Sequence, residues 1–283
     1  MKLMNQFVFE HNIEDRTQRY YGKFYKKLQK QKVLVIGAGA IGTEVIKNLA
    51  MLGIRYIYLV DFDKVSISNL NRCVFFKPED NGNTYKVDAI AREVKARWKQ
   101  IEIIPYQLPI QEAPDKIWDV PVVISAVDNN QARYYTNMRI LSSNNATFVI
   151  NGAMGKTFIE IQVLLPGKTS CLVCPWTKNY SANFFTKIVK ETCNDFFSET
   201  VEQFPSISIL NSMIGGLIAH ETVKILIGYQ KWKQKKQWED AYIPILGQVI
   251  RYDINTHDFT LGKTMPNPEC IEIFCRQSQN ING

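Results

Sequence analysis

Residues 32–42 read KVLVIGAGAIG, an apolar run that leads into a glycine-rich segment. The first five residues are mostly β-branched and apolar, which predicts a short buried strand. Gly37, Gly39 and Gly42 follow in the spacing GxGxxG, and apolar residues then recur at helical intervals. A strand, a glycine turn and a helix in this order let backbone N–H groups approach a phosphate. The stretch therefore predicts a nucleotide site, without distinguishing NAD, FAD and ATP.

The pattern of strands and helices continues outward from this stretch. Further strands are expected at residues 54–60, 101–106, 122–127 and 148–150. Strands alternating with helices predict a parallel sheet with right-handed crossovers. Residues 158–165 alternate only in part, which indicates antiparallel strands beside the parallel set. We therefore expect a Rossmann-like, doubly wound α/β fold with a mainly parallel sheet and an added antiparallel portion.

A single domain is expected over residues 1–283, because the sequence contains no internal repeat and no low-complexity linker. Residues 1–31 are polar, aromatic and basic, and we expect them to form an N-terminal helical arm. Residues from about 175 to 205 show no clear period and are expected to form a long crossover loop. The apolar run at 210–226 predicts a buried helix, and the lysines of residues 231–236 are expected in a solvated loop.

The composition is that of an ordinary globular protein, with 46% hydrophobic and 22% charged residues. The apolar runs are far shorter than the roughly 20 residues that span a bilayer, and the N-terminus lacks the apolar segment of a signal peptide. We therefore expect no membrane segment and a cytoplasmic location. The net charge of +7 suits an acidic partner, but the basic residues are spread out and do not indicate nucleic acid.

Charged side chains follow the second and fourth strands, where ligands bind in open α/β sheets. Asp61 lies about 20 residues after the glycine loop, where an acid binds ribose hydroxyls. Arg72 and Lys86 offer positive charge to phosphates, and Asp128 offers a carboxylate to Mg²⁺. A nicotinamide has no γ-phosphate to neutralise, so the set favours ATP with Mg²⁺. An NAD-dependent oxidoreductase is the alternative, supported only by the glycine loop and Asp61.

Together these motifs resemble the superfamily of ThiF, MoeB and the ubiquitin-activating enzymes, which adenylate carrier proteins. The matching segments are the glycine loop, D-x-D-x-V at 61–65, S-N-L-N-R at 68–72, Lys86, and Asp128-Asn129 with the following Arg133. The resemblance covers about residues 15 to 275. It implies a nucleotide site formed by Gly37, Gly39, Gly42, Asp61, Asp63, Asn69, Arg72, Lys86, Asp128 and Asn129.

The same resemblance implies the roles of individual residues. Arg72 and Asp128 would be catalytic, with Asp128 binding Mg²⁺. An N-terminal arginine, Arg16 or Arg19, would reach the site of a second subunit, which implies a homodimer. The family usually has glutamine after the S-N-L-N-R segment, where this chain has Cys73.

Four of the six cysteines form two close pairs, Cys171 with Cys174 and Cys270 with Cys275. Each pair follows a proline-containing turn, and four thiolates suit a tetrahedral, structural Zn²⁺. Two unrelated pairs of free cysteines are the alternative. The family carries the same pairs and the same zinc. The segment PNPEC at 266–270 closely resembles the activating enzymes of the ubiquitin-fold modifier.

The predicted reaction is ATP-dependent adenylation of the C-terminal carboxylate of a ubiquitin-like modifier or sulfur-carrier protein. Positioning and charge neutralisation would do most of the catalysis, because a carboxylate is already nucleophilic. Transfer to Cys193 as a thioester would follow, with an E2-like conjugating enzyme as partner. Without that transfer the reaction stops at the adenylate, which a sulfur donor attacks. Two further hypotheses are adenylation of a peptide or a tRNA base, and a silent subunit that only binds.

Overall fold

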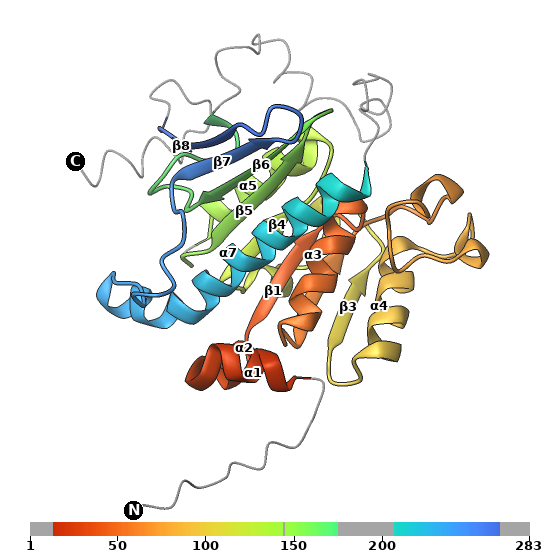
Figure 1. Ribbon diagram of the computed structural model, residues 1–283, viewed down its shortest axis with the longest axis horizontal. Helices are drawn as coiled ribbons and strands as arrows, with labels where there is room; N and C mark the ends of the chain where they lie inside the picture. Colours follow the sequence, from red (N-terminus) through yellow and green to blue (C-terminus); the bar gives the residue numbers. More distant parts are fainter. Residues whose placement is uncertain (1–13, 144, 175–206, 267–283) are drawn as a thin grey trace, which may run out of the picture.

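The computed structural model describes residues 14–143, 145–174 and 207–266. In this part of the chain, eight strands form one sheet in the order β3-β2-β1-β4-β5-β6-β7-β8, with helices on both faces (Figure 1). The first half of the sheet is parallel and the second half is antiparallel. The expected Rossmann-like architecture with an added antiparallel portion is therefore confirmed.

The parallel strands coincide with the short β-branched runs of the sequence. Their bounds are β1 (Lys32–Ile36), β2 (Tyr56–Val60), β3 (Glu102–Tyr106), β4 (Val122–Ser125) and the first residues of β5 (Phe148–Met154). Strand β1 pairs with β2 on one side and with β4 on the other. The chain therefore runs outward from β1 to β3 and returns to β4. This reversal places a topological switch point beside the end of β1, the position at which open α/β sheets bind ligands.

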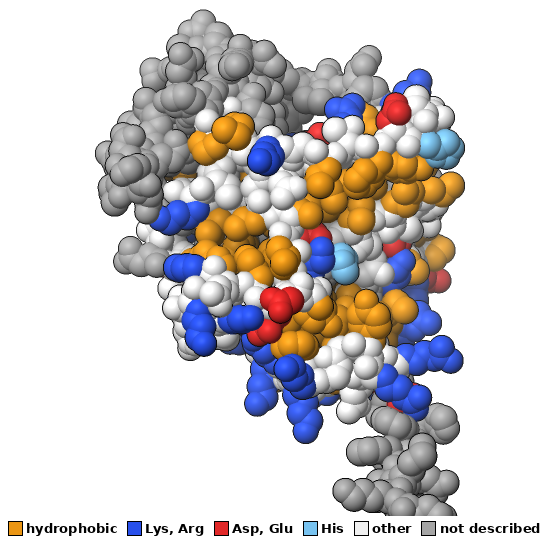
Figure 2. Space-filling model, turned by 60° about the vertical axis from the view of Figure 1, so that its left-hand side comes forward, with side chains coloured by type: hydrophobic (Ala, Val, Ile, Leu, Met, Phe, Trp, Pro, Cys, Tyr) orange, Lys and Arg blue, Asp and Glu red, His pale blue; other side chains and the backbone are white. Residues whose placement is uncertain are grey.

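The antiparallel half consists of β5, β6 (Phe158–Leu164), β7 (Gln248–Asp253) and β8 (Phe259–Lys263). Strand β8 forms the edge of the sheet. Its side chains Phe259 and Leu261 are 62% and 54% exposed. Figure 2 shows that hydrophobic side chains also lie at the surface in several areas of one face. Exposed apolar surface of this kind is typical of regions that contact another protein.

Helices cover the two faces unequally. The helices are α1 (Asp15–Tyr21), α2 (Tyr25–Leu28), α3 (Ala40–Met51), α4 (Lys86–Arg97), α5 (Asn130–Leu141) and α7 (Ser208–Lys235). Short 3₁₀ turns lie at η1 (Gly22–Phe24), η2 (Ile67–Asn69), η3 (Pro78–Asp80), η4 (Ile110–Glu112) and η5 (Asp115–Trp118). Residues of α3, α4 and α7 share one buried cluster with the sheet, and residues of α5, η4 and η5 share a second cluster.

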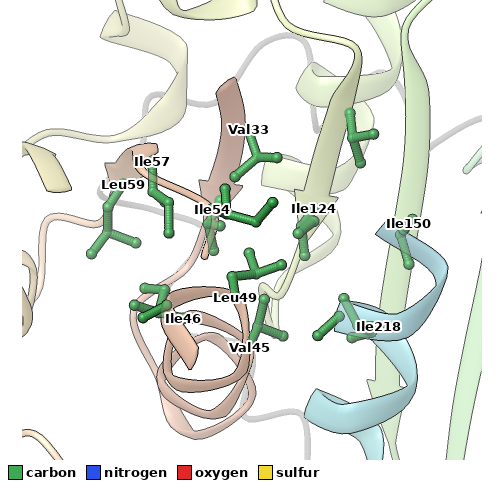
Figure 3. Close-up of a cluster of buried hydrophobic side chains, with 14 of the residues drawn as sticks. Val33, Val45, Ile46, Leu49, Ile54, Ile57, Leu59, Ile124, Ile150 and Ile218 are labelled. Carbon is green, nitrogen blue, oxygen red and sulfur yellow. The ribbon is translucent and has the colours of Figure 1, made fainter. Parts of the chain in front are cut away.

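The larger cluster holds α3 and α7 against the centre of the sheet. Figure 3 shows Val45 and Leu49 of α3 on the side of the helix that faces the strands, and Ile218 of α7 close to Ile150 of β5. The two helices approach closely at Gly215, because a Cβ atom there would lie 2.6 Å from the Cβ of Glu44. This packing fixes α3, the helix that follows the glycine loop.

One expectation about local structure is wrong. The lysine-rich segment 231–236 is not a loop, because α7 continues to Lys235. Lysine has a high helix propensity. Trp232 within the segment also packs against Phe148 and Trp238, with ring centroids 5.0 and 6.0 Å apart. In the described part of the chain, no helix combines the length and the apolar character needed to cross a membrane.

An ion pair between a buried carboxylate and a partly exposed guanidinium anchors α4 to the preceding turn. The carboxylate of Asp80 is 3% exposed and accepts two hydrogen bonds from the Arg92 guanidinium, both at 2.8 Å. It also accepts a hydrogen bond from the backbone N–H of Lys77. Together, first of all through Arg92, these donors lower the pKa of Asp80 to about 2. The pair fixes the helix that begins with Lys86.

We expect Asp80→Asn to lower the free energy of unfolding by about 1–2 kcal/mol near neutral pH. The folded-state pKa lies below the unfolded value of 3.8, so the stabilisation is complete above that value. It is lost as the pH falls toward about 2, and the difference between wild type and variant should then disappear. Urea unfolding at several pH values measures this. Asp115→Asn is the matched control, because Asp115 pairs with Arg139 but its side chain is 91% exposed. An equal effect in both variants would contradict the expectation.

Candidate nucleotide site

The glycine loop begins between the ends of two neighbouring strands. The backbone N–H of Gly37 donates to the carbonyl of Val60 at 2.9 Å, and the N–H of Ala126 donates to the carbonyl of Ile36 at 2.9 Å. Gly37 has a φ of +99°, and a Cβ atom there would lie 2.5 Å from the carbonyl oxygen of Ala126. Glycine is therefore required at this position by the chain itself. The loop lies directly beside the segment that leads to Asp128.

The other two glycines of the loop have different surroundings. At Gly42, a Cβ atom would lie 2.0 Å from the carbonyl oxygen of Gly37, so its glycine allows the helix to close onto the loop. At Gly39, a Cβ atom would have no such neighbour within 4 Å. Gly39 has φ −78° and ψ −158°, an extended conformation open to any residue. The fold itself therefore does not require glycine at position 39. A ligand that approaches the backbone closely would require it, because a side chain there would obstruct the approach.

Asp61 connects the end of β2 to the glycine loop. One carboxylate oxygen accepts a hydrogen bond from the backbone N–H of Ala38 at 2.6 Å, and the other accepts from the N–H of Asp63 at 2.8 Å. Burial raises the pKa of Asp61 above its ordinary value, although Lys86 and the Ala38 N–H act in the opposite direction. Asp61 thus shapes the loop, in addition to the ribose contact that the sequence predicts.

Lys86 places a positive charge beside this loop. It is the first residue of α4, its side chain is only 12% exposed, and its ammonium lies 2.6 Å from a carboxylate oxygen of Asp63. Burial lowers the pKa of Lys86, but Asp61 and Asp63 together raise it by more, so the pKa lies above its ordinary value. The ammonium is therefore charged at neutral pH, and its ion pair with Asp63 holds it in place.

Residues 66–73 form a compact turn that carries Arg72, which we call the arginine turn. The side-chain oxygen of Asn69 accepts a hydrogen bond from the N–H of Ser66 at 3.0 Å and so caps the 3₁₀ segment η2. The guanidinium of Arg72 donates to the carbonyl of Ser68 and to the side-chain oxygen of Asn71, the latter at 3.0 Å. Arg72 is only partly buried. Its orientation is thus fixed by its own turn, and part of its surface is open to solvent.

Asp128 and Asn129 lie between β4 and α5, and both are exposed. The side-chain oxygen of Asn129 caps α5 by accepting a hydrogen bond from the N–H of Ala132 at 2.8 Å. Arg133 donates to the carbonyl of Val127 at 2.8 Å and so fixes the segment between β4 and α5. Asp128 therefore lies on a segment held by hydrogen bonds, next to the loop that contains Gly37.

The structure brings most of the predicted nucleotide residues to one edge of the sheet. Asp61 bonds directly to the glycine loop at Ala38, Asp63 is hydrogen-bonded to Asp61, and Lys86 pairs with Asp63. Asp128 follows the strand end that contacts Gly37. The predicted N-terminal arginines lie elsewhere: α1 is near the start of β1, opposite the glycine loop (Figure 1). Arg19 pairs with Asp15 at 3.0 Å, whereas Arg16 is exposed. Cys193 lies outside the described residues.

One residue of the site was not identified from the sequence. Thr43 is fully buried in the first turn of α3, and its hydroxyl donates to the carbonyl of Gly39 at 2.6 Å. This bond fixes the carbonyl of the glycine that faces open space. A threonine four residues after a loop glycine is the signal, because that spacing allows a hydrogen bond back along a helix.

The first predicted zinc pair is well placed for metal binding. Cys171 and Cys174 are both buried, their sulfur atoms are 3.5 Å apart, and the N–H of Cys171 donates to the sulfur of Cys174. Two thiolates on one tetrahedral Zn²⁺ are about 3.8 Å apart, given Zn–S bonds of about 2.3 Å. The pair therefore fits two of four ligands. Cys270 and Cys275 lie outside the described residues, and the described ones contain no group of three metal-binding side chains.

Known proteins match large parts of this chain. The SUMO-activating enzyme subunit uba-2 of Caenorhabditis elegans is 34% identical over 159 residues, 53% of this chain and 26% of that protein. Ubiquitin-like modifier-activating enzyme 5 of the same organism is 24% identical over 271 residues, 90% of this chain and 58% of that protein. The chain therefore spans less than two thirds of the length of these relatives.

The same architecture occurs in a solved structure. The crystal structure of E. coli MccB with ATP has a TM-score of 0.70 and 21% sequence identity, over 94% of this chain and 74% of that one. At this identity the likeness concerns the fold alone. The family itself follows from a direct match, because the model of the ThiF family covers residues 13–271 and includes the glycine loop, the arginine turn and both sheet halves. This chain belongs to the ThiF family.

Proposed function

We propose that this chain uses Mg·ATP to adenylate the C-terminal carboxylate of a ubiquitin-like or sulfur-carrier protein. One observation supports this most directly. The ammonium of Lys86, on a side chain only 12% exposed, pairs with Asp63 near a loop whose central glycine, Gly39, faces open space. A fixed charge next to accessible backbone suits a polyphosphate, since neither needs to reorganise when the charge of the leaving group develops. The relatives that the chain resembles are activating enzymes for SUMO and for a ubiquitin-like modifier.

In the proposed reaction, a carboxylate oxygen of the carrier attacks the α-phosphorus of ATP. The bond between the α-phosphorus and the bridging oxygen breaks, and pyrophosphate leaves with its electron pair. The products are the carrier acyl-adenylate and pyrophosphate. Backbone N–H groups around Gly39 and the N-terminus of α3 would hold the phosphates, while Lys86 and Arg72 would stabilise the charge on the leaving pyrophosphate.

Mg²⁺ binding is assigned to Asp128. Its carboxylate is exposed at a strand end next to the glycine loop, and hard oxygen ligands suit this ion. When bound, Mg²⁺ would neutralise phosphate oxygens. Asp61 would hold the ribose from its position beside Ala38. Asn129 caps α5 in the structure, so we assign it mainly to the orientation of this segment.

The proposal includes a second subunit. Arg16 is exposed on α1, at the edge of the sheet opposite the glycine loop, so it would act in a neighbouring subunit rather than in its own. The exposed apolar side chains of β8 are one surface available for partner proteins.

The zinc site of Cys171, Cys174, Cys270 and Cys275 would be structural. A thioester on Cys193 and transfer to an E2-like enzyme would follow adenylation.

Pyrophosphate–ATP exchange tests the proposal. Purified protein is incubated with Mg·ATP, labelled pyrophosphate and a panel of ubiquitin-like and sulfur-carrier proteins that end in an accessible carboxylate. We expect exchange with at least one carrier and none with the same carrier after its C-terminal residue is removed. If only short peptides support exchange, the substrate is a peptide and not a carrier protein. No exchange, together with binding of NAD, would favour the oxidoreductase.

The step after adenylation needs a separate assay. A non-reducing gel of enzyme, ATP and an active carrier should show a thiol-sensitive adduct if a thioester forms. Loss of this adduct in Cys193→Ala would assign the thioester to Cys193, and its persistence would exclude that residue. Absence of any adduct, with exchange intact, would place the product at the acyl-adenylate.

A further inference from the structure

Basic residues that are far apart in the sequence lie together at one end of the fold. The ammonium of Lys27, on α2, donates to the carbonyl of Ile227 on α7 at 2.5 Å. The rings of Phe24 and Tyr242 lie 5.4 Å apart and join the same two parts of the chain. Residues 14–32 and 231–243 thereby form one surface, which we call the lysine patch. It lies at the end of the sheet opposite the glycine loop (Figure 1).

The lysine patch accounts for the whole net charge of the chain. Of 34 basic and 27 acidic residues, the patch contains eleven and four, which leaves 23 of each kind elsewhere. Three of its four carboxylates already pair with cations, namely those of Glu14, Asp15 and Glu239. Seven exposed lysines pair with no carboxylate in the described part of the chain: Lys23, Lys26, Lys30, Lys32, Lys233, Lys235 and Lys236. Figure 2 shows basic side chains gathered around the lower end of the molecule.

The composition of the lysine patch indicates the kind of partner that it fits. Its eleven basic residues are nine lysines and two arginines. Arginine is the residue of choice for bidentate contacts with nucleic acid, and lysine is depleted in protein–protein interfaces. Lysine is a flexible point charge that needs no fixed acceptor geometry, so a lysine-rich surface suits a diffuse layer of anions.

Exposed apolar side chains accompany these charges. Tyr20 is 74% exposed and Ile243 is 58% exposed, and each belongs to one of the two segments of the lysine patch. Side chains of this kind enter the boundary between the headgroups and the acyl chains of a bilayer, while nearby lysines keep their ammonium groups in water. Clusters of four to eight basic residues are typical of segments that bind anionic lipids.

We propose that the lysine patch docks the protein onto a bilayer surface that contains anionic phospholipids. The unpaired ammonium groups would lie among the headgroups, where their attraction acts over about one Debye length. Because the patch lies opposite the glycine loop, the nucleotide site would face away from the bilayer and stay open to its substrates. Docking of this kind goes beyond the adenylation reaction and does not depend on it.

Co-sedimentation with vesicles tests the proposal. The purified protein is mixed with vesicles of phosphatidylcholine alone, or of phosphatidylcholine with phosphatidylserine. We expect binding only to the vesicles that contain phosphatidylserine. Raising the salt concentration from about 0.1 M to about 1 M should release the protein, because the Debye length falls from about 10 Å to about 3 Å. Absence of binding, or equal binding to both kinds of vesicle, would overturn the proposal.

Two triple variants separate the lysine patch from the net charge. The first carries Lys26→Gln, Lys30→Gln and Lys233→Gln, and the second carries Lys116→Gln, Lys156→Gln and Lys263→Gln, at exposed lysines outside the patch. Both remove three positive charges. The first should weaken vesicle binding at least about tenfold, since each lysine near an anionic surface contributes up to about fivefold, and the second by less than about twofold. Equal losses in both variants would overturn the assignment to this patch.

Two further measurements accompany the vesicle assay. Both triple variants should unfold in urea at the wild-type midpoint, because the six lysines are exposed and make no ion pair with a carboxylate among the described residues. A labelled double-stranded oligonucleotide is tested in parallel by fluorescence anisotropy. If the protein binds the oligonucleotide but not the vesicles, the partner is a nucleic acid and the lipid assignment is wrong.

Discussion

Lys86→Met is expected to reduce pyrophosphate–ATP exchange by roughly a hundred- to a thousandfold, the range for removal of one preorganised donor from an active site. The ammonium is 12% exposed and lies 2.6 Å from Asp63. Its removal leaves the carboxylates of Asp61 and Asp63 facing the phosphates without compensation. The loss of positive charge and the repulsion between anions therefore act in the same direction. Initial rates of exchange over a range of ATP concentrations measure the effect.

The protein provides a matched control for this substitution. Lys224 of α7 has an 18% exposed side chain and lies 2.7 Å from the buried carboxylate of Glu221. Lys224→Met therefore also removes one partner of an ion pair, but outside the glycine loop and the arginine turn. It should change stability and leave exchange near the wild-type rate. Similar losses of exchange in both variants would remove the argument for a phosphate contact at Lys86.

The parallel part of the fold was predictable because its signals are local. A buried strand, a glycine turn and an amphipathic helix are each encoded within about a dozen residues. Ile36, Gly37 and Val45 were therefore placed correctly from sequence alone. The strand order is not local, but repeated strand–helix–strand units with right-handed crossovers restrict it strongly.

The antiparallel part was less predictable. Strand β7 contains Arg251 and Asp253, and β8 carries exposed Phe259 and Leu261, so neither reads as a buried strand. Strand β7 pairs with β6, more than 80 residues earlier in the chain, and β8 then pairs with β7. Such long-range pairing has no short-range signature. The end of α7 was missed for a related reason, because Trp232 packs against residues that are distant in sequence.

The predicted site residues differ in the contacts that they make within the protein. The sequence assigned Asn69 and Asp61 to ligand contacts, but both also hold the protein's own backbone, at Ser66 and at Ala38. Sequence spacing places a side chain near a site without showing which of its atoms are already engaged. The three glycines of the loop are the clearest case. They share one motif, yet Gly37 and Gly42 are required by neighbouring backbone and Gly39 is not.

Gly39→Val is therefore expected to weaken binding of Mg·ATP by roughly a hundredfold while the protein stays folded. The backbone at Gly39 is extended, and nothing lies within 4 Å of a Cβ atom built there, so the side chain would begin in open space. Two methyl groups would then occupy the space through which a phosphate approaches, and overpacking of this kind costs about 1–3 kcal/mol. Calorimetry of Mg·ATP binding and urea unfolding measure the two properties separately.

Gly42→Ala should show the opposite pattern, because its methyl group would lie 2.0 Å from the carbonyl oxygen of Gly37. Helix α3 must then move away from the loop, so unfolding should become easier by about 1–3 kcal/mol. Gly216→Ala is the steric control and should not destabilise the protein, since nothing lies within 4 Å of that position on α7 and alanine favours a helix over glycine. No predicted nucleotide residue lies on that helix. If Gly39→Val unfolded as easily as Gly42→Ala, the loop would need Gly39 for its own conformation, and the open space there would not indicate a ligand. A stable Gly39→Val variant with unchanged ATP affinity would move the phosphates away from this glycine.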